Sequence, residues 1–395
     1  MLSQRQLFLN HVAQTSETPL ALEIIKAEGV YLIDASGKRY LDLISGISVS
    51  NVGHRHPKVV AAIKEQVDTY MHLMVYGEYI QSPQVTLAKK ISDQLPQNLS
   101  AVYFVNSGSE AIEGALKLAK RFTGRTEIIS FKNAYHGSSH GSLSIMGNEE
   151  FKNAFRPLLP DTNLIEFNAV AGFSHITERT ACVVVETIQG EAGAVVPQND
   201  FLKKLSAHCK ARGVLLIADE IQCGFGRTGS LFAFEQYGFV PDILCIAKGM
   251  GGGMPIGAFI SSKEIMYSLT SNPILGHITT FGGHPVCCAA AAATLQVLLE
   301  EKLIEGVAAK ELLFRTLLQH PKIRSVNGKG LLLSVEFDSY EQNKAIIDSC
   351  IQKGVITDWF LFNAHSMRIA PPLTITEGEI KFACTTILSA IAEGD

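Results

Sequence analysis

The sequence has 395 residues, of which 47% are hydrophobic and 18% are charged, and its formal net charge is −4. Since one hydrophobic core rarely grows to this size, we expect two subdomains, and the mild acidity argues against nucleic acid or an anionic membrane as a partner. The longest apolar stretch, at 286–299, is interrupted by Thr294 and Gln296 and is shorter than the ~20 apolar residues of a membrane span.

The amino-terminal stretch MLSQRQLFLN is polar and lacks the apolar core of a secretory signal. The 8 cysteines contain no C-x-x-C pair, although Cys287 and Cys288 are adjacent. This pattern is typical of scattered reduced thiols. We therefore expect a cytoplasmic protein.

The first predicted element is a β-hairpin at 29–44, with Ser36 and Gly37 in the turn. From about residue 100 to 260, short apolar runs alternate with helical patterns, such as the one at 110–122. Near-continuous apolar runs are typical of strands that are buried on both faces of a parallel sheet. The alternation predicts a doubly wound α/β domain. The predicted strands are Ala101–Asn106, Glu127–Phe131, Ala181–Glu186, Gly213–Asp219 and Asp242–Ala247.

The tail, from about Ala289, contains two long helical patterns and short predicted strands at 330–337 and 367–369. Together with the hairpin, these elements predict a smaller α+β domain built from both chain ends. The predicted division is 1–55 for the amino-terminal part of the small domain, 56–288 for the large domain and 289–395 for the carboxy-terminal part of the small domain.

Three chemically reactive residues stand at the ends of predicted strands. Glu186 closes one run, Asp219 closes the next, and Lys248 directly follows the last. Because open α/β sheets bind ligands outside the carboxyl ends of their strands, we expect all three side chains to face one crevice. A single charged residue in such a place is usually just solvated, but three in one array predict a site.

Lys248 lies in a glycine-rich stretch, at 247–253. A nucleophilic amine must be partly unprotonated, which desolvation or a nearby cation favours. The glycines also leave room for a flat ring and a bound substrate. Taken alone, the same pattern fits an exposed lysine on a flexible loop.

Asp219 is predicted to be buried, and a buried aspartate needs a cation or hydrogen-bond donors beside it. A protonated pyridine nitrogen would be such a cation, and the carboxylate would keep that ring electron-withdrawing. Gln222, three residues further on, could reach a hydroxyl group of the ring. On its own, Asp219 also fits a helix N-cap.

Gly108 and Ser109 stand between a predicted strand and an amphipathic helix. Gly108 lets the backbone approach an anion, Ser109 adds a hydroxyl group, and the helix N-terminus offers free N–H groups. An ordinary serine cap with Glu110 in the first turn is the alternative. Tyr135, which precedes a His-Gly pair, could stack on a pyridine ring.

The complete set resembles the class III aminotransferases of the ornithine and GABA type, which are pyridoxal-phosphate (PLP) enzymes of fold type I. The resemblance extends over nearly the full chain, and the order and spacing of the motifs match the family. The motifs that carry it are Gly53–Pro57, Ser107–Ala111, Tyr135–Gly137, Glu186–Glu191, Asp219–Gln222, Gly226–Gly229, Ala247–Gly249, Thr279–Gly283 and Arg368–Leu373.

The resemblance implies a role for each matching residue. Lys248 would carry PLP as a Schiff base and shuttle protons, and Asp219 would pair with the pyridine nitrogen. Arg368 would bind the α-carboxylate of an amino acid or keto acid, and Glu186 would pair with that arginine when no α-carboxylate is present. The resemblance also implies that Gly108 and Ser109 bind the phosphate of PLP, that Tyr135 stacks on its ring, and that Gln222 bonds to the ring hydroxyl O3′. Thr280 would contact the phosphate of the neighbouring subunit's cofactor. This last contact implies a homodimer.

Three positions depart from the family's pattern. After Tyr-His-Gly these enzymes usually carry an arginine that holds a second substrate carboxylate, whereas this chain has Ser138. A serine does not replace a permanently charged, bidentate guanidinium. This serine weakens the case for ornithine, acetylornithine and GABA as donors, although another arginine could serve. Thr187 and His284 stand where proline and asparagine are usual, and neither is given a role.

Two other motifs compete with this interpretation. The stretch 224–229 matches G-x-G-x-x-G, but it neither directly follows a strand nor opens a helix, so we do not expect NAD binding. The stretch 137–141 matches G-x-S-x-G, which would make Ser139 the nucleophile of a serine hydrolase, but no predicted strand ends before it. The histidines show no metal-binding spacing, and we expect no metal.

The predicted function is a PLP-dependent aminotransferase that transfers an amino group from an ω-amino acid, an amine or an amino acid to 2-oxoglutarate or pyruvate by a ping-pong mechanism. Other fold type I reactions, namely those of aminomutases, racemases and decarboxylases, share the same site residues and stay open as alternatives.

Overall fold

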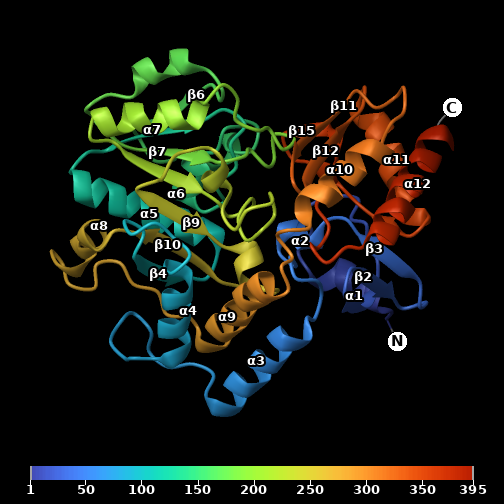
Figure 1. Ribbon diagram of the computed structural model, residues 1–395, viewed down its shortest axis with the longest axis horizontal. Helices are drawn as coiled ribbons and strands as arrows, with labels where there is room; N and C mark the ends of the chain where they lie inside the picture. Colours follow the sequence, from blue (N-terminus) through green and yellow to red (C-terminus); the bar gives the residue numbers. More distant parts are fainter. Residues whose placement is uncertain (1, 394–395) are drawn as a thin grey trace.

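A seven-stranded sheet forms the centre of the larger part of the molecule in the computed structural model, which describes residues 2–393 (Figure 1). Strands β5 to β9 pair in parallel, and β10 runs antiparallel to both of its neighbours, β4 and β9. The predicted, mostly parallel sheet is confirmed. In spatial order the strands are β4 (Ala101–Val105), β10 (Gly257–Ser261), β9 (Ile243–Ile246), β8 (Leu215–Asp219), β7 (Thr180–Glu186), β5 (Glu127–Phe131) and β6 (Thr162–Ile165).

Helices cover both faces of this sheet. Alternate residues of β7 belong to different cores: Cys182 and Val184 pack in the core of α5 (Gly108–Thr123), whereas Val183 and Val185 pack in that of α7 (Phe201–Ala211). This two-sided burial explains why the strands are nearly continuous apolar runs. The other helices of this part are α3 (Pro57–Thr69), α4 (Ser82–Ser92), α6 (His140–Ser144), α8 (Lys263–Tyr267) and α9 (Pro285–Glu300), with short 3₁₀ turns at Asn153–Phe155, Val170–His175, Ala233–Gln236, Lys248–Gly251 and Ser268–Thr270.

Two four-stranded sheets, made from both ends of the chain, form the other side of the molecule (Figure 1). The predicted hairpin is confirmed as β2 and β3, which pair antiparallel around a turn in which Gly37 has a φ of 85°. The first sheet contains β1 (Ile24–Glu28), β2 (Tyr31–Asp34), β3 (Arg39–Asp42) and β13 (Val355–Ile356), and the second contains β11 (Ser325–Lys329), β12 (Leu332–Glu336), β15 (Asn363–Ile369) and β14 (Trp359–Phe360). Their helices are α2 (Ser45–Ser48), α10 (Val307–Leu317), α11 (Tyr340–Gln352) and α12 (Glu377–Glu393).

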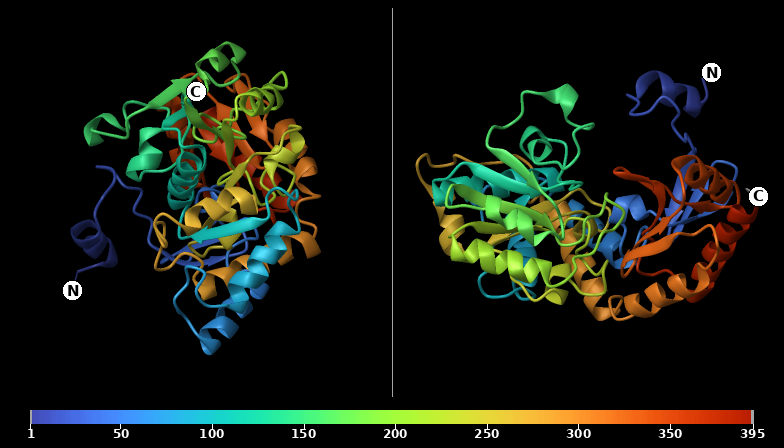
Figure 2. Two further views of the ribbon diagram at one scale, coloured as in Figure 1. Left: turned by 90° about the vertical axis from the view of Figure 1, so that its left-hand side faces the viewer. Right: turned by 90° about the horizontal axis from the view of Figure 1, so that it is seen from above.

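The amino-terminal helix α1 (Gln4–His11) lies apart from the body of the molecule, as the right-hand view of Figure 2 shows, and none of its residues is buried. Within residues 2–393, no helix has both the length and the apolar character that crossing a membrane requires.

Substituting Gly114 with alanine is expected to destabilise the fold. Gly114 faces β10 from α5, and a Cβ atom there would stand 2.2 Å from Cε1 of Phe259. Overpacking of this kind costs about 1–3 kcal/mol, more than the ~1 kcal/mol that alanine contributes as a better helix former. The expected result is a melting temperature lowered by about 1–3 °C. Gly378→Ala, on α12 in open space, is the matched control and should not lower it.

Candidate active site

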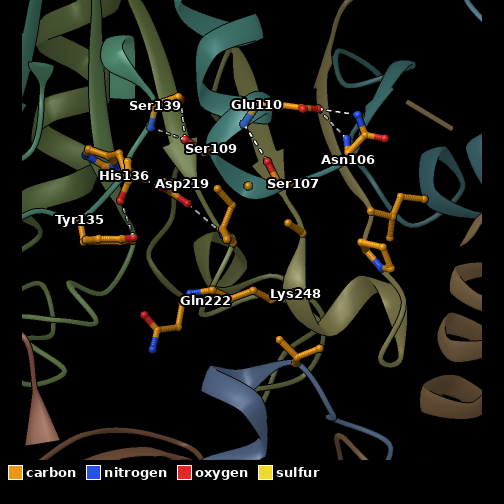
Figure 3. A pocket seen from close by; sticks show the side chains of 18 of the residues that line it. Asn106, Ser107, Ser109, Glu110, Tyr135, His136, Ser139, Asp219, Gln222 and Lys248 are labelled. Atoms are coloured by element: carbon orange, nitrogen blue, oxygen red, sulfur yellow. Dashed lines mark hydrogen bonds and ion pairs between the residues drawn. The ribbon is translucent and has the colours of Figure 1, made fainter. Parts of the chain in front are cut away.

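A cavity of about 720 Å³ opens at the carboxyl ends of the central strands (Figure 3). Glu186 ends β7, Asp219 ends β8 directly opposite it in the parallel register, and Lys248 follows β9. The strand β4 runs in the same direction as β9, so the start of α5 reaches the same edge. Seven of the predicted site residues line this one cavity, namely Gly108, Ser109, Tyr135, Glu186, Asp219, Gln222 and Lys248.

Lys248 begins a short 3₁₀ turn with its backbone in the left-handed region, at a φ of 47°. Removal from bulk water lowers the pKa of its amine, although the carboxylates of Glu191 and Asp219 act in the opposite direction. A lowered pKa keeps a larger fraction of the amine unprotonated and therefore nucleophilic. The structure thus shields Lys248 from bulk water, which is the condition that favours a nucleophilic amine.

Asp219 is buried and oriented by two contacts. Its Oδ1 accepts a hydrogen bond from the Ile221 N–H at 3.0 Å, and its Oδ2 lies 2.7 Å from Nδ1 of His136. The fully buried His136 ring in turn contacts Ser130 Oγ at 3.1 Å through Nε2. No pattern in the sequence assigned a role to His136. Its place next to Tyr135 was the available signal, but the contact with Asp219 joins residues 83 positions apart.

The side-chain amide of Gln222 contains a buried N–H group, at Nε2, that donates no hydrogen bond within the described residues. An unsatisfied buried donor costs about 1–3 kcal/mol, so it points to an acceptor on a bound ligand. Gly190 allows the close approach of this side chain, because a Cβ atom there would lie 2.2 Å from Gln222 Oε1.

The start of α5 forms a cradle of small residues. Ser107 caps the helix by accepting a bond from the Glu110 N–H at 3.2 Å, and Gly108 has no space for a Cβ atom, which would stand 2.8 Å from Ile221. Ser109 Oγ lies 2.6 Å from Ser139 Oγ and accepts a bond from the Ser139 N–H. Free N–H groups and the positive end of a helix dipole suit an anion such as a phosphate.

The hydroxyl group of Ser139 is engaged in hydrogen bonds with neighbouring side chains. Its Oγ donates to Glu113 Oε1 at 2.7 Å and contacts Ser109 and Ser142. No histidine contacts it in the part of the chain that the structure describes, so the catalytic base that a serine hydrolase needs is missing from its contacts.

Glu186 does not pair with Arg368, and that prediction is wrong. Both of its oxygens accept backbone bonds, from the Tyr135 N–H and the Gly190 N–H, each at 2.9 Å. Burial raises the pKa of the Glu186 carboxyl to about 7. Glu186 therefore fastens the Tyr135 loop to the sheet, and Arg368 is not among its hydrogen-bond partners.

Glu191 is the partner of Arg368 instead. The Arg368 guanidinium donates to both Glu191 oxygens at 3.0 and 2.9 Å, and its Nε donates to Asp358 at 2.8 Å. Burial alone would lower the Arg368 pKa, but the two carboxylates outweigh it and raise that pKa. The loop between β14 and β15 is tied to the same glutamate, because the Leu361 N–H donates to Glu191 Oε2 and the Phe362 N–H to its carbonyl.

Arg368 and Thr280 do not line the cavity. Arg368 is close enough for its charge to lower the Lys248 pKa. Thr280 is exposed and lies in a segment with exposed apolar side chains, so nothing in the single chain brings it to the cavity. Its predicted contact with a neighbouring subunit's cofactor stays a prediction. The exposed apolar residues of this segment are Ile274, Leu275, Ile278 and Phe281.

Comparisons with known proteins agree with this arrangement. Residues 12–391 match the aminotransferase class-III family. An acetylornithine aminotransferase from Methanopyrus kandleri is 38% identical over 384 residues, 96% of each chain, and a putrescine aminotransferase from Pectobacterium atrosepticum is 40% identical over 363 residues, 87% of this chain and 77% of that protein. The crystal structure of an ornithine aminotransferase from Toxoplasma gondii superimposes with a TM-score of 0.92 at 29% identity, covering 100% of this chain and 96% of that one.

Proposed function

Because the chain belongs to the class-III aminotransferases and is thus a PLP-dependent transaminase, we propose that it works by a ping-pong sequence with 2-oxoglutarate or pyruvate as the acceptor. The donor class is an ω-amino acid, an amine or an amino acid. The observation that carries the proposal is the meeting of Lys248, Asp219 and Gln222 in one cavity beside the cradle of α5.

The residues present fit the cofactor. The glycine cradle of α5 suits its phosphate, the unpartnered Gln222 Nε2 suits its ring hydroxyl, and the buried Asp219 carboxylate suits a protonated ring nitrogen. Tyr135 would cover the ring. When bound, PLP supplies an aldehyde that reacts with amines and a ring that withdraws electrons from the adjacent bond.

Lys248 would perform both covalent attachment and proton transfer. Its Nζ would hold the cofactor and, once free as an amine, would act as the base for the proton on the donor carbon that bears the nitrogen. The lowered pKa of the free Lys248 amine supports this second role, since an amine must be unprotonated to accept a proton. Asp219, oriented by His136, would hold the proton of the ring nitrogen in place.

Arg368 would hold the α-carboxylate of the acceptor in exchange for Glu191. The bidentate geometry between Arg368 and Glu191 is the geometry that a substrate carboxylate needs. For donors without an α-carboxylate, Glu191 would keep the guanidinium neutralised. Glu191 would then have the role that the family resemblance implied for Glu186.

Arg368→Lys should raise the KM for 2-oxoglutarate by about 10- to 100-fold, because a lysine keeps the charge but loses the bidentate fork. The kcat/KM for donors without an α-carboxylate should fall much less. Steady-state kinetics with the two substrates varied separately checks this. Equal losses for both substrate types would contradict the assignment. The lysine variant is preferred to alanine because removing the cation would leave the buried Glu191 carboxylate and the half-buried Asp358 carboxylate unpaired.

We further propose a homodimer in which Thr280 completes the neighbouring site, and the exposed apolar side chains around Thr280 support an interface there. The division into 1–55, 56–288 and 289–395 is proposed as well, supported by the separate sheets of the two parts. Helix α9, which spans the last boundary, packs against α3 and α4 of the larger part. A cytoplasmic location is supported by the eight cysteines, all free and buried.

The ping-pong proposal is tested by separating the half-reactions. The cofactor-loaded enzyme is mixed with L-glutamate alone, and 2-oxoglutarate is measured. One equivalent per site is expected, followed by conversion of added pyruvate to alanine after the glutamate has been removed. If no product formed until both substrates were present, the sequence would be wrong.

A further inference from the structure

Arg227 is among the largest fully buried side chains of the protein and stands in the glycine-rich stretch 224–229. The chain turns tightly here, since Gly226 has a φ of 88° and a Cβ atom on it would stand 2.9 Å from the side chain of Leu373. Burial lowers the pKa of Arg227 to about 9, although the charge of Asp42 acts in the opposite direction. A buried cation without a paired anion is costly, so this guanidinium calls for a function that an apolar side chain would not perform.

The guanidinium of Arg227 joins three segments that are far apart in the sequence. Its Nη1 donates to the carbonyls of Leu331 at 2.9 Å and Pro371 at 2.5 Å, and its Nη2 donates to Oδ1 of Asn51 at 2.5 Å. These three acceptors are neutral and lie 104, 144 and 176 positions from Arg227. Because the donors of an arginine lie in one rigid plane, a single guanidinium sets the positions of all three acceptors relative to one another.

Two of these acceptors belong to the strands around Arg368. Strands β12 and β15 pair antiparallel, with Ser334 opposite Arg368. Leu331 directly precedes β12, and Pro371 comes three positions after Arg368, just beyond the end of β15. The Nη1 group of Arg227 therefore holds both strands together at the end where Arg368 lies.

The third acceptor belongs to the surroundings of Lys248. A Cβ atom on Gly249 would stand 2.4 Å from Nδ2 of Asn51, so the Asn51 amide lies directly against the turn that Lys248 begins. The same Nδ2 donates to the carbonyl of Phe225 at 2.9 Å. Asn51 is fully buried and, like Arg227, does not line the cavity. Both side chains therefore act on the site only through the segments that they hold.

We propose that Arg227 is a positioning residue that fixes the separation between Arg368 and Lys248. This inference rests on the proposed roles of those two residues and adds the group that relates them. An amino acid or keto acid must bind its α-carboxylate at Arg368 and present the neighbouring carbon at Lys248 at the same time. A small amine without a carboxylate needs only the Lys248 side of the site. Loss of the Arg227 fork should therefore affect substrates that use both groups and spare a small amine.

The first test uses Arg227→Lys, which keeps a donor and a charge but loses the planar fork. In the cofactor-loaded variant, the kcat/KM of the L-glutamate half-reaction should fall about 10- to 100-fold, because a misplacement of about 1 Å costs on the order of 10²-fold. The rate at which methylamine releases Lys248, followed by absorbance, should stay within about twofold of the wild type. Equal losses with both amines would show general damage and overturn the inference.

The wild-type enzyme separates a failure of this inference from a failure of the proposed function. If the wild type converts L-glutamate and Arg227→Lys does so equally fast, only the role of Arg227 is overturned. If the wild type does not convert L-glutamate, the proposed function falls and this inference falls with it. Asn51→Ala, which cuts the arm toward Lys248, is the second variant should Arg227→Lys fail to fold, and it should show the same difference between L-glutamate and methylamine.

Arg125→Lys is the matched control. The half-buried Arg125 also joins three carbonyls through one Nη1, those of Thr180 at 3.1 Å, Arg212 at 3.2 Å and Gly213 at 2.9 Å. These carbonyls lie at the amino ends of β7 and β8, on the opposite edge of the sheet from the cavity. The control loses the same kind of fork, and its L-glutamate half-reaction should keep the wild-type rate. A loss there as large as in Arg227→Lys would overturn a specific role for Arg227.

Amide hydrogen exchange of the cofactor-loaded enzyme gives a readout without substrate. The N–H groups of Ala370 and Leu373 both donate to carbonyls of the amino-terminal segment, at 2.7 and 2.8 Å. In Arg227→Lys their exchange should be faster by on the order of 10-fold, while exchange in β7 keeps the wild-type rate, because only the segment after β15 has lost its anchor. Wild-type exchange at Ala370 and Leu373 would mean that this segment does not depend on Arg227, and the inference would be wrong.

Discussion

Lys248→Ala is expected to reduce turnover by at least about 10⁴-fold while leaving the fold intact. The variant lacks the only amine in the cavity lining of the described residues, so it loses both the covalent attachment and the base. The measurement is kcat with 2-oxoglutarate as the acceptor, together with circular dichroism to check the fold. Added methylamine should restore part of the rate because a free amine replaces the missing one.

Lys263→Ala, which removes an exposed lysine at the start of α8, is the control and should keep the wild-type rate. Multiple turnovers by Lys248→Ala without any added amine would rule out the assigned role. A variant that fails to fold would be recognised by its circular dichroism, and Lys248→Arg, which keeps the charge but not a nucleophilic amine, then provides the second measurement.

Asp219→Asn should lower kcat by about 10³-fold, the second largest effect. The amide has nearly the shape of the carboxylate and keeps an oxygen for the Ile221 N–H, so the backbone contact at 3.0 Å survives. The negative charge that holds a proton on the cofactor's ring nitrogen is lost. Rapid-mixing measurement of the L-glutamate half-reaction separates this chemical defect from weaker cofactor binding.

The exposed Asp93 on the surface supplies the control Asp93→Asn, which should be neutral. A half-reaction rate in Asp219→Asn within about threefold of the wild type, with the cofactor bound, would be incompatible with the electrostatic role.

The features predicted most accurately from the sequence are the strands whose own composition identifies them. Strand β5 matches its predicted bounds, and β7 and β8 end at the predicted residues Glu186 and Asp219, because two-sided burial gives continuous apolar runs. Strands β6 and β10 were missed, since TNLI contains two polar residues and GAFIS begins with glycine and ends with serine. Their pairing partners, rather than their own composition, make them strands.

Contacts between distant segments account for the errors in the site. The family motifs gave Arg368 a glutamate partner, but whether Glu186 or Glu191 reaches the guanidinium depends on where the folded chain places the two carboxylates. The Tyr135 N–H that binds Glu186 lies 51 positions away in the sequence, and no local pattern reports this contact. The bond between His136 and Asp219 has the same origin in the fold.

The two bonds that tie the β14–β15 loop to Glu191 connect this loop to the carboxylate that holds Arg368. In the proposed exchange, a keto acid bound to Arg368 would release the Glu191 carboxylate from the guanidinium. The bond from the Phe362 N–H goes to the Glu191 carbonyl and not to that carboxylate, so the loop would keep this backbone attachment throughout the exchange.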